Sequence, residues 1–439
     1  MRMTFGTAMA ATLAFAATAP LAAQAVRQPA PVPQAQATRA LPQVQALVQR
    51  YVAEKRAPGL AVAIGHDDAP PALLAAGRTG TAPDAAAVTP DSLWRVYSMT
   101  KPITGIAAMI LVEEGKLKLD QPISDFFPAY KNMRVLTDPD NSLESRPAAR
   151  EITVRHLLTH TAGLGYNIVT KGPLLKEYER LGIIPAALNM QTEAQGRAVR
   201  PNSLREFAER TATLPLIADP GTKWSYSIAL DIMGAVIEAA SGMPFERFVQ
   251  TRIFDPLDMA SSYWQVPESE KGRLVDNYAW VGENLVPLDP AANSVFLQPP
   301  SFPYGGAGLV MSARDYDRFL AMLQHYGTLA GRRILKPETA RLAMSNLLPQ
   351  GVTYARVDDA TGGSAGPNTG YGAGGSVMLE DVPGGPAAGT YGWGGAAGTI
   401  AFVDPKSRVR AVGMVNYFPA GKWPLRADII QAAYSDLKR

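Results

Sequence analysis

Apolar positions near the start of the chain recur with the spacing of a helix and then gather into short runs. Between residues 41 and 55 they fall three or four apart, which predicts an amphipathic helix. The runs at 59–65 and 72–77 are bounded by Gly and Pro and predict two buried strands. From 103 to 112 nearly every residue is apolar, which indicates a helix buried on all sides, with Gly115 as its C-terminal cap.

The middle third of the chain is dominated by helical patterns separated by loops. Asn202 and Ser203 are suited to cap the first of these helices. A second helix is predicted over 228–241, where Gly242 ends it. Pro244 fits the first turn of a third helix, because its missing N–H has no partner there anyway.

The last third of the chain changes from helical to strand spacing. Ser312 and Asp315 resemble a capping box that opens one more helix. The segments 398–405 and 408–417 then predict paired strands around a Pro-Lys-Ser turn. A final helix is expected around residues 425–433.

The order of these elements predicts two lobes. At 439 residues the chain exceeds one ordinary hydrophobic core. Strands and helices occur at both ends, and helices fill the middle. The simplest closure is an α/β lobe built from 41–165 plus 301–439, with a mostly helical lobe, 166–300, inserted into it.

The N-terminus predicts an exported protein. Residues 1–25 contain Arg2, an apolar run and then Ala-Gln-Ala, the layout of a secretory signal with its cleavage site. Residues 26–40 are rich in Pro, Ala and Gln and are interpreted as a linker. No other segment reaches about 18 uninterrupted apolar residues, so no membrane span is expected in the mature form. We expect a secreted protein, in the bacterial periplasm.

Composition narrows the function classes. The chain has 42 basic and 39 acidic residues, a net charge of +3, and no basic run, so no nucleic-acid partner is expected. Four histidines and no cysteine argue against a structural zinc site, disulfides and cysteine catalysis. No metal or other cofactor is expected, and nothing in the pattern sets the oligomeric state.

Two motifs with catalytic analogues are interpreted as structural. The segment GGSAG (362–366) matches the G-x-S-x-G nucleophile elbow, which requires a strand before it and a helix after it. No helical pattern follows for more than ten residues, so we interpret it as a glycine loop. His156 and His160 lie four apart on a helix predicted to end near Gly163, but no acidic ligand accompanies them as in H-E-x-x-H. We interpret them as residues that cap or pack this helix.

The segment YSMTKPITG (97–105) offers a nucleophile beside a base. Ser98 and Lys101 are three residues apart, so on one helical turn their side chains can touch. Burial and a helix N-terminus both favour the neutral form of a lysine, which can then take the serine proton. Pro102 is best tolerated in a first turn, which places the helix start near Ser98 and leaves the Ser98 N–H free. S-x-x-K alone is a weak motif.

Two further motifs make the pattern specific: WSYSIALD (224–231) and WGGAAGT (393–399). With S-x-x-K before them, the sequence resembles the serine β-lactamase and penicillin-binding-protein superfamily, specifically the family VIII carboxylesterases. The resemblance runs over about residues 41–438. It implies the class C β-lactamase fold, in the α+β or α/β class, with an antiparallel sheet flanked by helices and an inserted mostly helical lobe.

The resemblance also implies roles for individual residues. Ser98 would be the nucleophile, and Lys101 and Tyr226 would share the roles of base and acid. The backbone N–H groups of Ser98 and Ala396 would form the oxyanion hole. The substrate-binding residues implied or expected near this site are Trp393, Gly394, Gly395 and Tyr166.

Two departures from the β-lactamase pattern bear on the substrate. β-Lactamases of this class carry a K-T-G motif and a Y-x-N motif. Trp393 stands at the position of the lysine of K-T-G, and Ile228 replaces the asparagine of Y-x-N. Both changes favour neutral, apolar acyl groups. The resemblance therefore implies a serine carboxylesterase for short- to medium-chain esters of small molecules, working through an acyl-enzyme. The alternatives are a β-lactamase or D-amino-acid peptidase, an acyltransferase to an alcohol, and a binding protein without catalysis.

Overall fold

The computed structural model describes residues 40–354 and 368–437. The predicted signal segment, the linker up to residue 39 and the GGSAG segment lie outside the described residues. The described residues all belong to one compact unit. The lobe boundaries at 165 and 300 stay a prediction.

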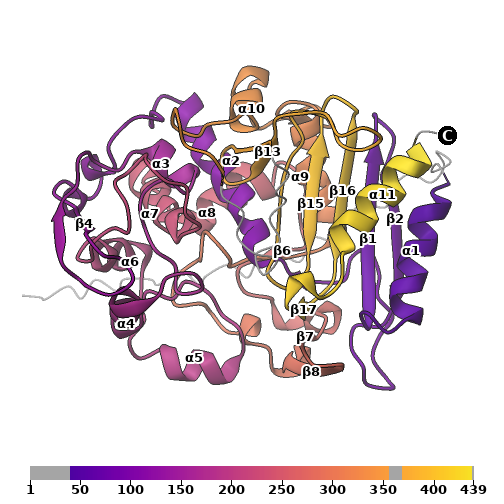
Figure 1. Cartoon of the computed structure of the whole chain (residues 1–439). Helices are drawn as coiled ribbons and strands as arrows, with labels where there is room; N and C mark the ends of the chain where they lie inside the picture. Colours follow the sequence, from indigo (N-terminus) through magenta and orange to yellow (C-terminus); the bar gives the residue numbers. More distant parts are fainter. Residues whose placement is uncertain (1–39, 355–367, 438–439) are drawn as a thin grey trace, which may run out of the picture. The chain divides into compact units, whose positions relative to one another are not determined.

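A seven-stranded antiparallel sheet forms the centre of the fold, in the order β12-β13-β14-β15-β16-β1-β2 (Figure 1). The strand next to the N-terminal pair comes from the end of the chain, because β1 pairs with β16 from Ala61↔Met414 to His66↔Val409. This pairing joins the two ends of the chain in one sheet, as the sequence predicts. The strands are β1 Gly59–His66, β2 Ala72–Gly77, β12 Thr369–Tyr371, β13 Ser376–Met378, β14 Tyr391–Gly394, β15 Ile400–Asp404 and β16 Val409–Met414.

Helices cover both faces of this sheet. On one face, α1 (Pro42–Ala53) and α11 (Leu425–Leu437) bury their apolar stripes against side chains of β1, β15 and β16. On the other, α9 (Ala313–Gln324) packs on the same three strands, and α2 (Thr100–Glu113) packs on β14. Every residue of α2 from Thr100 to Leu111 is buried, which confirms the prediction of a helix enclosed on all sides. Each large apolar side chain buried in this way contributes about 1.5–3 kcal/mol.

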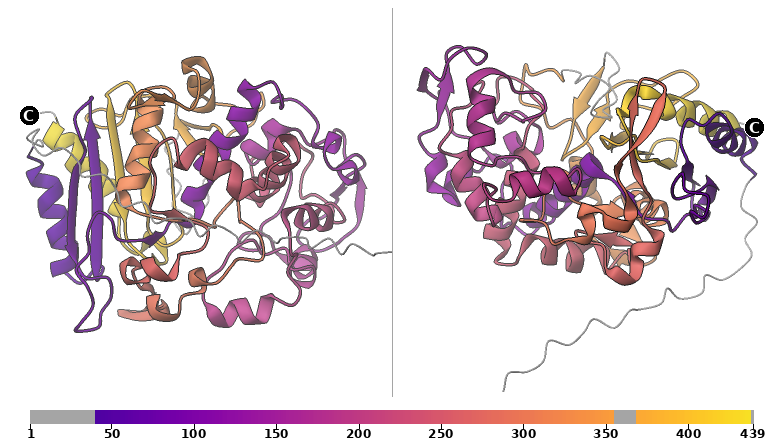
Figure 2. Two further views of the ribbon diagram at one scale, coloured as in Figure 1. Left: turned by 180° about the vertical axis from the view of Figure 1, so that it is seen from behind. Right: turned by 90° about the horizontal axis from the view of Figure 1, so that it is seen from below.

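A group of helices between β5 and β6 in sequence lies beside the sheet, and Figure 2 shows it from two further directions. Its longest member, α7, packs against α2, α3, α6 and α8 and thereby ties the group to the buried helix. The helices are α3 Val154–Leu158, α4 Gly172–Arg180, α5 Met190–Gly196, α6 Leu204–Thr211, α7 Ala229–Ser241 and α8 Phe245–Val249.

Two smaller three-stranded sheets accompany the central sheet. In one, β9 lies between β3 and β6; in another, β7 lies between β17 and β8. The hairpins β4–β5 and β10–β11 and the helix α10 complete the strands and α-helices of the described residues. Their bounds are β3 Trp94–Arg95, β4 Arg134–Leu136, β5 Ser145–Pro147, β6 Ser262–Tyr263, β7 Asn277–Val281, β8 Asn284–Asp289, β9 Val310–Met311, β10 Thr328–Leu329, β11 Arg332–Arg333, α10 Pro337–Ala343 and β17 Tyr417–Phe418.

Most predicted helix ends are confirmed, with two differences. Ser203 caps α6 by accepting the Glu206 N–H, and Gly242 ends α7 with a φ of 70°. Pro244 is the N-cap of α8, one position earlier than predicted. Ser312 caps α9, but the carboxylate of Asp315 accepts hydrogen bonds from the Ser261 N–H and the Ser262 hydroxyl instead of completing a capping box.

Candidate active site

Ser98 and Lys101 lie at the start of the buried helix α2. Strand β3 leads into a 3-10 turn, Tyr97–Met99, and α2 follows directly, so that Pro102 falls in its first turn. The Lys101 side chain is fully buried, and its Nζ donates to Ser98 Oγ at 3.1 Å and to the Gly306 carbonyl at 2.7 Å. The predicted contact between serine and lysine is present.

Tyr226 approaches the same serine from a different part of the chain. It lies in the loop just before α7, and its hydroxyl donates to Ser98 Oγ at 2.7 Å. Lys101 Nζ lies 4.6 Å from the centre of the Tyr226 ring, within the range of a cation–π contact. Ser98 Oγ is thus hydrogen-bonded to both Lys101 and Tyr226, and no more than 6% of any of the three residues is exposed.

The turn after β14 carries the predicted second oxyanion donor. Gly395 donates its N–H to the Thr399 carbonyl, and a Cβ at Gly395 would lie 2.4 Å from the Val96 carbonyl oxygen. Only glycine therefore allows this turn to approach the segment before Ser98. Among the described residues, the N–H groups of Ser98 and Ala396 have no hydrogen-bond acceptor. Free N–H donors of this kind suit an oxyanion site, and that role of Ser98 and Ala396 stays a prediction.

The two predicted aromatic wall residues have different surroundings. The Tyr166 ring lies 5.4 Å from the Tyr226 ring and 5.6 Å from Lys101 Nζ, and burial raises its pKa well above the usual range. Trp393 is fully buried in β14 and packs at 5.2 Å on Tyr371 and 5.9 Å on Tyr226. Trp393 therefore packs against Tyr226, and its role in substrate binding stays a prediction. Gly394 and Gly395 are buried next to it.

The two histidines do not share a helix face. Helix α3 ends at Leu158, so His160 lies beyond it, with a φ of 55°. The expectation of one helix extending to Gly163 is therefore wrong. His156 accepts the Thr153 N–H in a capping box, which confirms its capping role. His160 accepts the Ser227 N–H and lies 4.9 Å from the Tyr226 ring, where burial lowers its pKa well below the usual range.

Known proteins share this arrangement of strands and helices. The Beta-lactamase family model matches residues 44–435. The chain belongs to this family. It is 32% identical to esterase EstB of Burkholderia gladioli over 74% of this chain and 76% of that protein. It is 31% identical to lovastatin esterase of Penicillium rubens over 80% and 86%. The solved structure of EstCE1, a hydrolase with promiscuous acyltransferase activity, matches with a TM-score of 0.71 at 25% identity, over 89% of this chain and 97% of that one.

Family membership confirms the fold class and the resemblance given above. This member of the Beta-lactamase family is a serine hydrolase, and its relatives support esterase or acyltransferase activity. No helix among residues 40–354 and 368–437 has the length and apolar content needed to cross a membrane. Within the same residues, no group of three or more His, Cys, Asp or Glu side chains is arranged to hold a metal ion.

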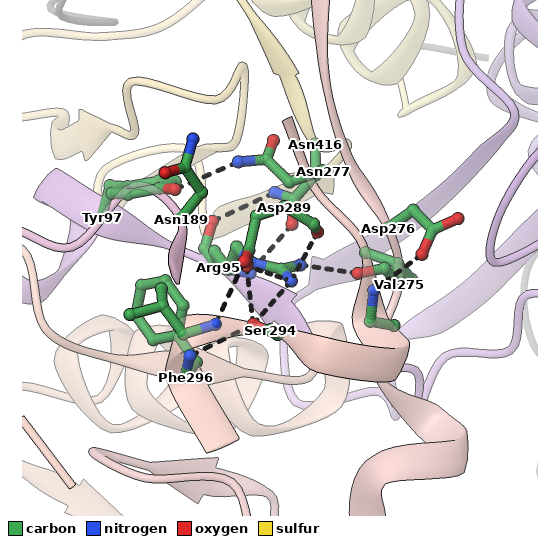
Figure 3. Close-up of polar contacts among 12 residues, drawn as sticks. Arg95, Tyr97, Asn189, Val275, Asp276, Asn277, Asp289, Ser294, Phe296 and Asn416 are labelled. Atoms are coloured by element: carbon green, nitrogen blue, oxygen red, sulfur yellow. Dashed lines mark hydrogen bonds and ion pairs between the residues drawn. The ribbon is translucent and has the colours of Figure 1, made fainter. Parts of the chain in front are cut away.

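In this family member a buried polar framework supports the strand before the nucleophile (Figure 3). We call it the Arg95 framework: Arg95, Asn277, Asp289, Ser294 and Asn416. Arg95 is fully buried, and its Nε donates to Asp289 Oδ2 at 2.7 Å. Asn416 bonds both the N–H and the carbonyl of Arg95, and Asn277 donates to the hydroxyl of Tyr97 at 3.1 Å.

The framework holds an unusual backbone conformation next to Ser98. Tyr97 has a φ of 42°, a region that bulky side chains rarely occupy. Its ring packs edge-on against Phe296 and Phe418, and its hydroxyl is held by Asn277. A strained residue of this kind costs about 1–3 kcal/mol and persists only where its surroundings fix it. The framework thereby sets the direction of the Ser98 N–H and side chain.

Sequence reasoning missed three residues near the site. The Gly306 carbonyl accepts a hydrogen bond from Lys101, and Asp231 accepts the Gly306 N–H. Tyr371 packs between His160 and Trp393. The Gly305-Gly306 pair and the fifth residue after Tyr226 are visible in the sequence. Nothing in the local pattern connects them to Lys101.

Proposed function

We propose that this protein is a serine carboxylesterase that hydrolyses short- to medium-chain esters through an acyl-enzyme on Ser98. The observation that carries the proposal is the pair of hydrogen bonds that Ser98 Oγ receives, 3.1 Å from Lys101 and 2.7 Å from Tyr226. A serine hydroxyl is a poor nucleophile unless a neighbouring group takes its proton. Here two such groups are in contact with it.

The first half of the reaction forms the acyl-enzyme. Ser98 Oγ attacks the ester carbonyl carbon and gives its proton to the Lys101–Tyr226 pair. The oxygen that becomes negative is bound by the N–H groups of Ser98 and Ala396. Tyr226 then returns the proton to the departing alkoxide, which leaves as the alcohol. Because the two proton carriers interact closely, the proton belongs to the pair and not to one residue.

The second half restores the serine. Water replaces the alcohol, gives a proton to the same pair and attacks the acyl carbon. The carboxylic acid departs as Ser98 Oγ regains its proton. No metal or cofactor takes part in these steps. If an alcohol enters in place of water, the product is a new ester.

Neutral esters are the substrates we propose. Trp393 brings no charge to the position where K-T-G has a lysine, and the apolar Ile228 cannot hydrogen-bond an acylamide. Parallel rates on p-nitrophenyl butyrate, a chromogenic cephalosporin and a D-Ala-D-Ala peptide test this ranking. If the ester is the slowest substrate, the proposal is wrong.

Labelling with a fluorophosphonate and mapping of the adduct tests the nucleophile. Label should appear on Ser98 alone, and Ser98→Ala should abolish both labelling and ester hydrolysis. Ser364→Ala is the control, because Ser364 is the serine of the G-x-S-x-G segment. Activity that survives Ser98→Ala and disappears in Ser364→Ala would reverse the assignment.

Acyl transfer to an alcohol is the second candidate, favoured by the likeness to EstCE1, which is described as a hydrolase with promiscuous acyltransferase activity. Product analysis with added alcohol separates it from hydrolysis. A new ester in excess of the free acid would make transfer the main activity.

We also propose that the chain is exported after cleavage at residue 25, on the strength of the signal-like segment 1–25. The mass and N-terminal sequence of the protein expressed in a bacterium test this. A cytoplasmic product that keeps Met1 would contradict it.

A further inference from the structure

A fully buried carboxylate lies close to Lys101 and has no part in the mechanism above. Asp231, in the first turn of α7, accepts the Gly306 N–H through Oδ1 at 2.8 Å. Its Oδ2 has no hydrogen-bond partner among the described residues. A buried carboxylate that is only partly hydrogen-bonded costs stability, so its presence needs a reason other than packing.

Gly306 links this carboxylate to the catalytic lysine. Its N–H is bound by Asp231, and its carbonyl accepts the 2.7 Å hydrogen bond from Lys101 Nζ. Thr104 Oγ1 holds the preceding carbonyl, that of Gly305, at 2.6 Å. A Cβ on Gly306 would lie 2.6 Å from Asp231 Oδ2, so the backbone at Gly306 is in close contact with the carboxylate. The carbonyl that fixes Lys101 is therefore itself fixed by Asp231.

We propose that Asp231 is a positioning residue, which holds Gly306 so that Lys101 stays within reach of Ser98 and which balances the positive charge of Lys101 once it has taken the Ser98 proton. The proposal rests on the proposed function of Ser98 and Lys101. The titratable groups that act on the carboxylate are Lys101 from α2 and Tyr166 from the loop after α3.

Two substitutions separate the hydrogen bond from the charge. Asp231→Asn keeps an oxygen for the Gly306 N–H and removes the charge, whereas Asp231→Val removes both. We expect kcat to fall about 10-fold in the Asn variant and about 100-fold in the Val variant, part of the 10²–10⁴ that a positioned base contributes. KM should change little, because Asp231 does not touch the substrate. Gly306→Ala disturbs the contact between Gly306 and Asp231 by adding a Cβ close to the carboxylate, and it should also lower kcat.

The pH profile gives a readout that a purely structural role would not move. Burial raises the pKa of Asp231 to about 7, and the charge of Lys101 opposes this rise. The carboxylate is ionised above that pH, so kcat of the unaltered protein should fall as the pH drops through about 7. This acid limb should be absent from the Asp231→Asn variant.

Asp404→Asn is the matched control. Asp404 is also fully buried and accepts a backbone N–H, that of Ala387, at 2.9 Å, but it lies in β15 and contacts the C-terminal helix through Tyr434. Its replacement should lower stability and leave kcat and the acid limb unchanged. Urea unfolding of each variant shows that it is folded, and the Asn variant keeps the test decisive if the Val variant does not fold.

The outcomes distinguish this inference from the proposed function. If fluorophosphonate labels Ser98 equally fast in Asp231→Asn and in the unaltered protein, or if the acid limb persists in that variant, the role of Asp231 is refuted and the proposed function is not affected. The same holds if Asp404→Asn loses as much kcat. If Ser98 is not labelled even in the unaltered protein, the proposed function itself fails.

Discussion

Removal of the Asp289 carboxylate is the sharpest test of the Arg95 framework. The carboxylate is 1% exposed and pairs with a guanidinium that is 0% exposed. It accepts from Arg95 Nε at 2.7 Å, from the Ser294 hydroxyl at 2.6 Å and from the Val295 N–H at 3.0 Å. Asp289→Ala leaves these three donors without that acceptor, and one of them is charged.

The loss of stability follows from this burial. Breaking a buried ion pair by removing one partner costs about 3–5 kcal/mol, because a charge is left without compensation. We therefore expect the free energy of unfolding to fall by about 3–5 kcal/mol in Asp289→Ala. The double variant Arg95→Met/Asp289→Leu removes both charges and should be clearly less destabilised than the single variant.

Activity should fall as well, because Arg95 lies three residues before Ser98 and the framework fixes the left-handed Tyr97. A misplacement of about 1 Å can cost up to about 100-fold in rate, so kcat should drop about 10-fold or more under conditions where the variant is folded. Urea unfolding followed by circular dichroism gives the stability, and p-nitrophenyl butyrate gives the rate. A loss below about 1 kcal/mol with unchanged kcat would refute the reasoning.

Three further predictions address neighbouring residues. Tyr226→Phe removes the hydroxyl that donates to Ser98 Oγ and should lower kcat for ester hydrolysis by about 10²-fold or more. The free energy of unfolding in urea should change by only about 1 kcal/mol. His160 stays neutral because burial lowers its pKa well below the usual range, so His160→Gln should leave the shape of the kcat–pH profile between pH 5 and 8 unaltered, and a limb that disappears would contradict this. Burial lowers the pKa of His156 to about 4, so the unfolded chain binds the proton first and stability should fall as the pH drops from about 6.5 to 4, by on the order of 3 kcal/mol. His156→Gln keeps an acceptor for the capping box and should remove this part of the pH dependence; an unchanged pH dependence would show that His156 is not its source.

Much of the fold could be predicted because the signals are local. The spacing of apolar residues located α1, α2, α7, α11 and the strands β1, β2, β15 and β16 within a few residues. The contact between Ser98 and Lys101 is also local, since one helical turn brings them together. By contrast, α3 ends at Leu158 although apolar and histidine spacing continues, because His160 turns out of the helix to pack under Tyr226.

The parts of the site that local spacing could not give depend on contacts between distant segments. Tyr226, which lies 128 residues from Ser98, was predicted only from the motif around it. Gly306 meets Lys101 through a backbone carbonyl, which any residue possesses, so its side-chain identity carries no chemical signal. Asp231 looks in the sequence like an ordinary acidic residue in a helical first turn, where such residues are common. Its burial comes from the packing of α7 against α2 and could not be read from the local pattern.

The electrostatics of the centre support the substrate class proposed from the motifs. Lys101 and Asp231 are both fully buried, and their charges offset one another across Gly306. Any positive charge on Lys101 is thus compensated within the protein and is a weak attraction for an anionic substrate. Trp393 adds no second cation, and its full burial places its indole against Tyr226 and Tyr371. A substrate carboxylate entering this site would lose its hydration without gaining an unpaired partner, which costs several kcal/mol. A neutral ester carries no such cost, and in the proposed reaction the charge on its carbonyl oxygen would be bound by the N–H groups of Ser98 and Ala396.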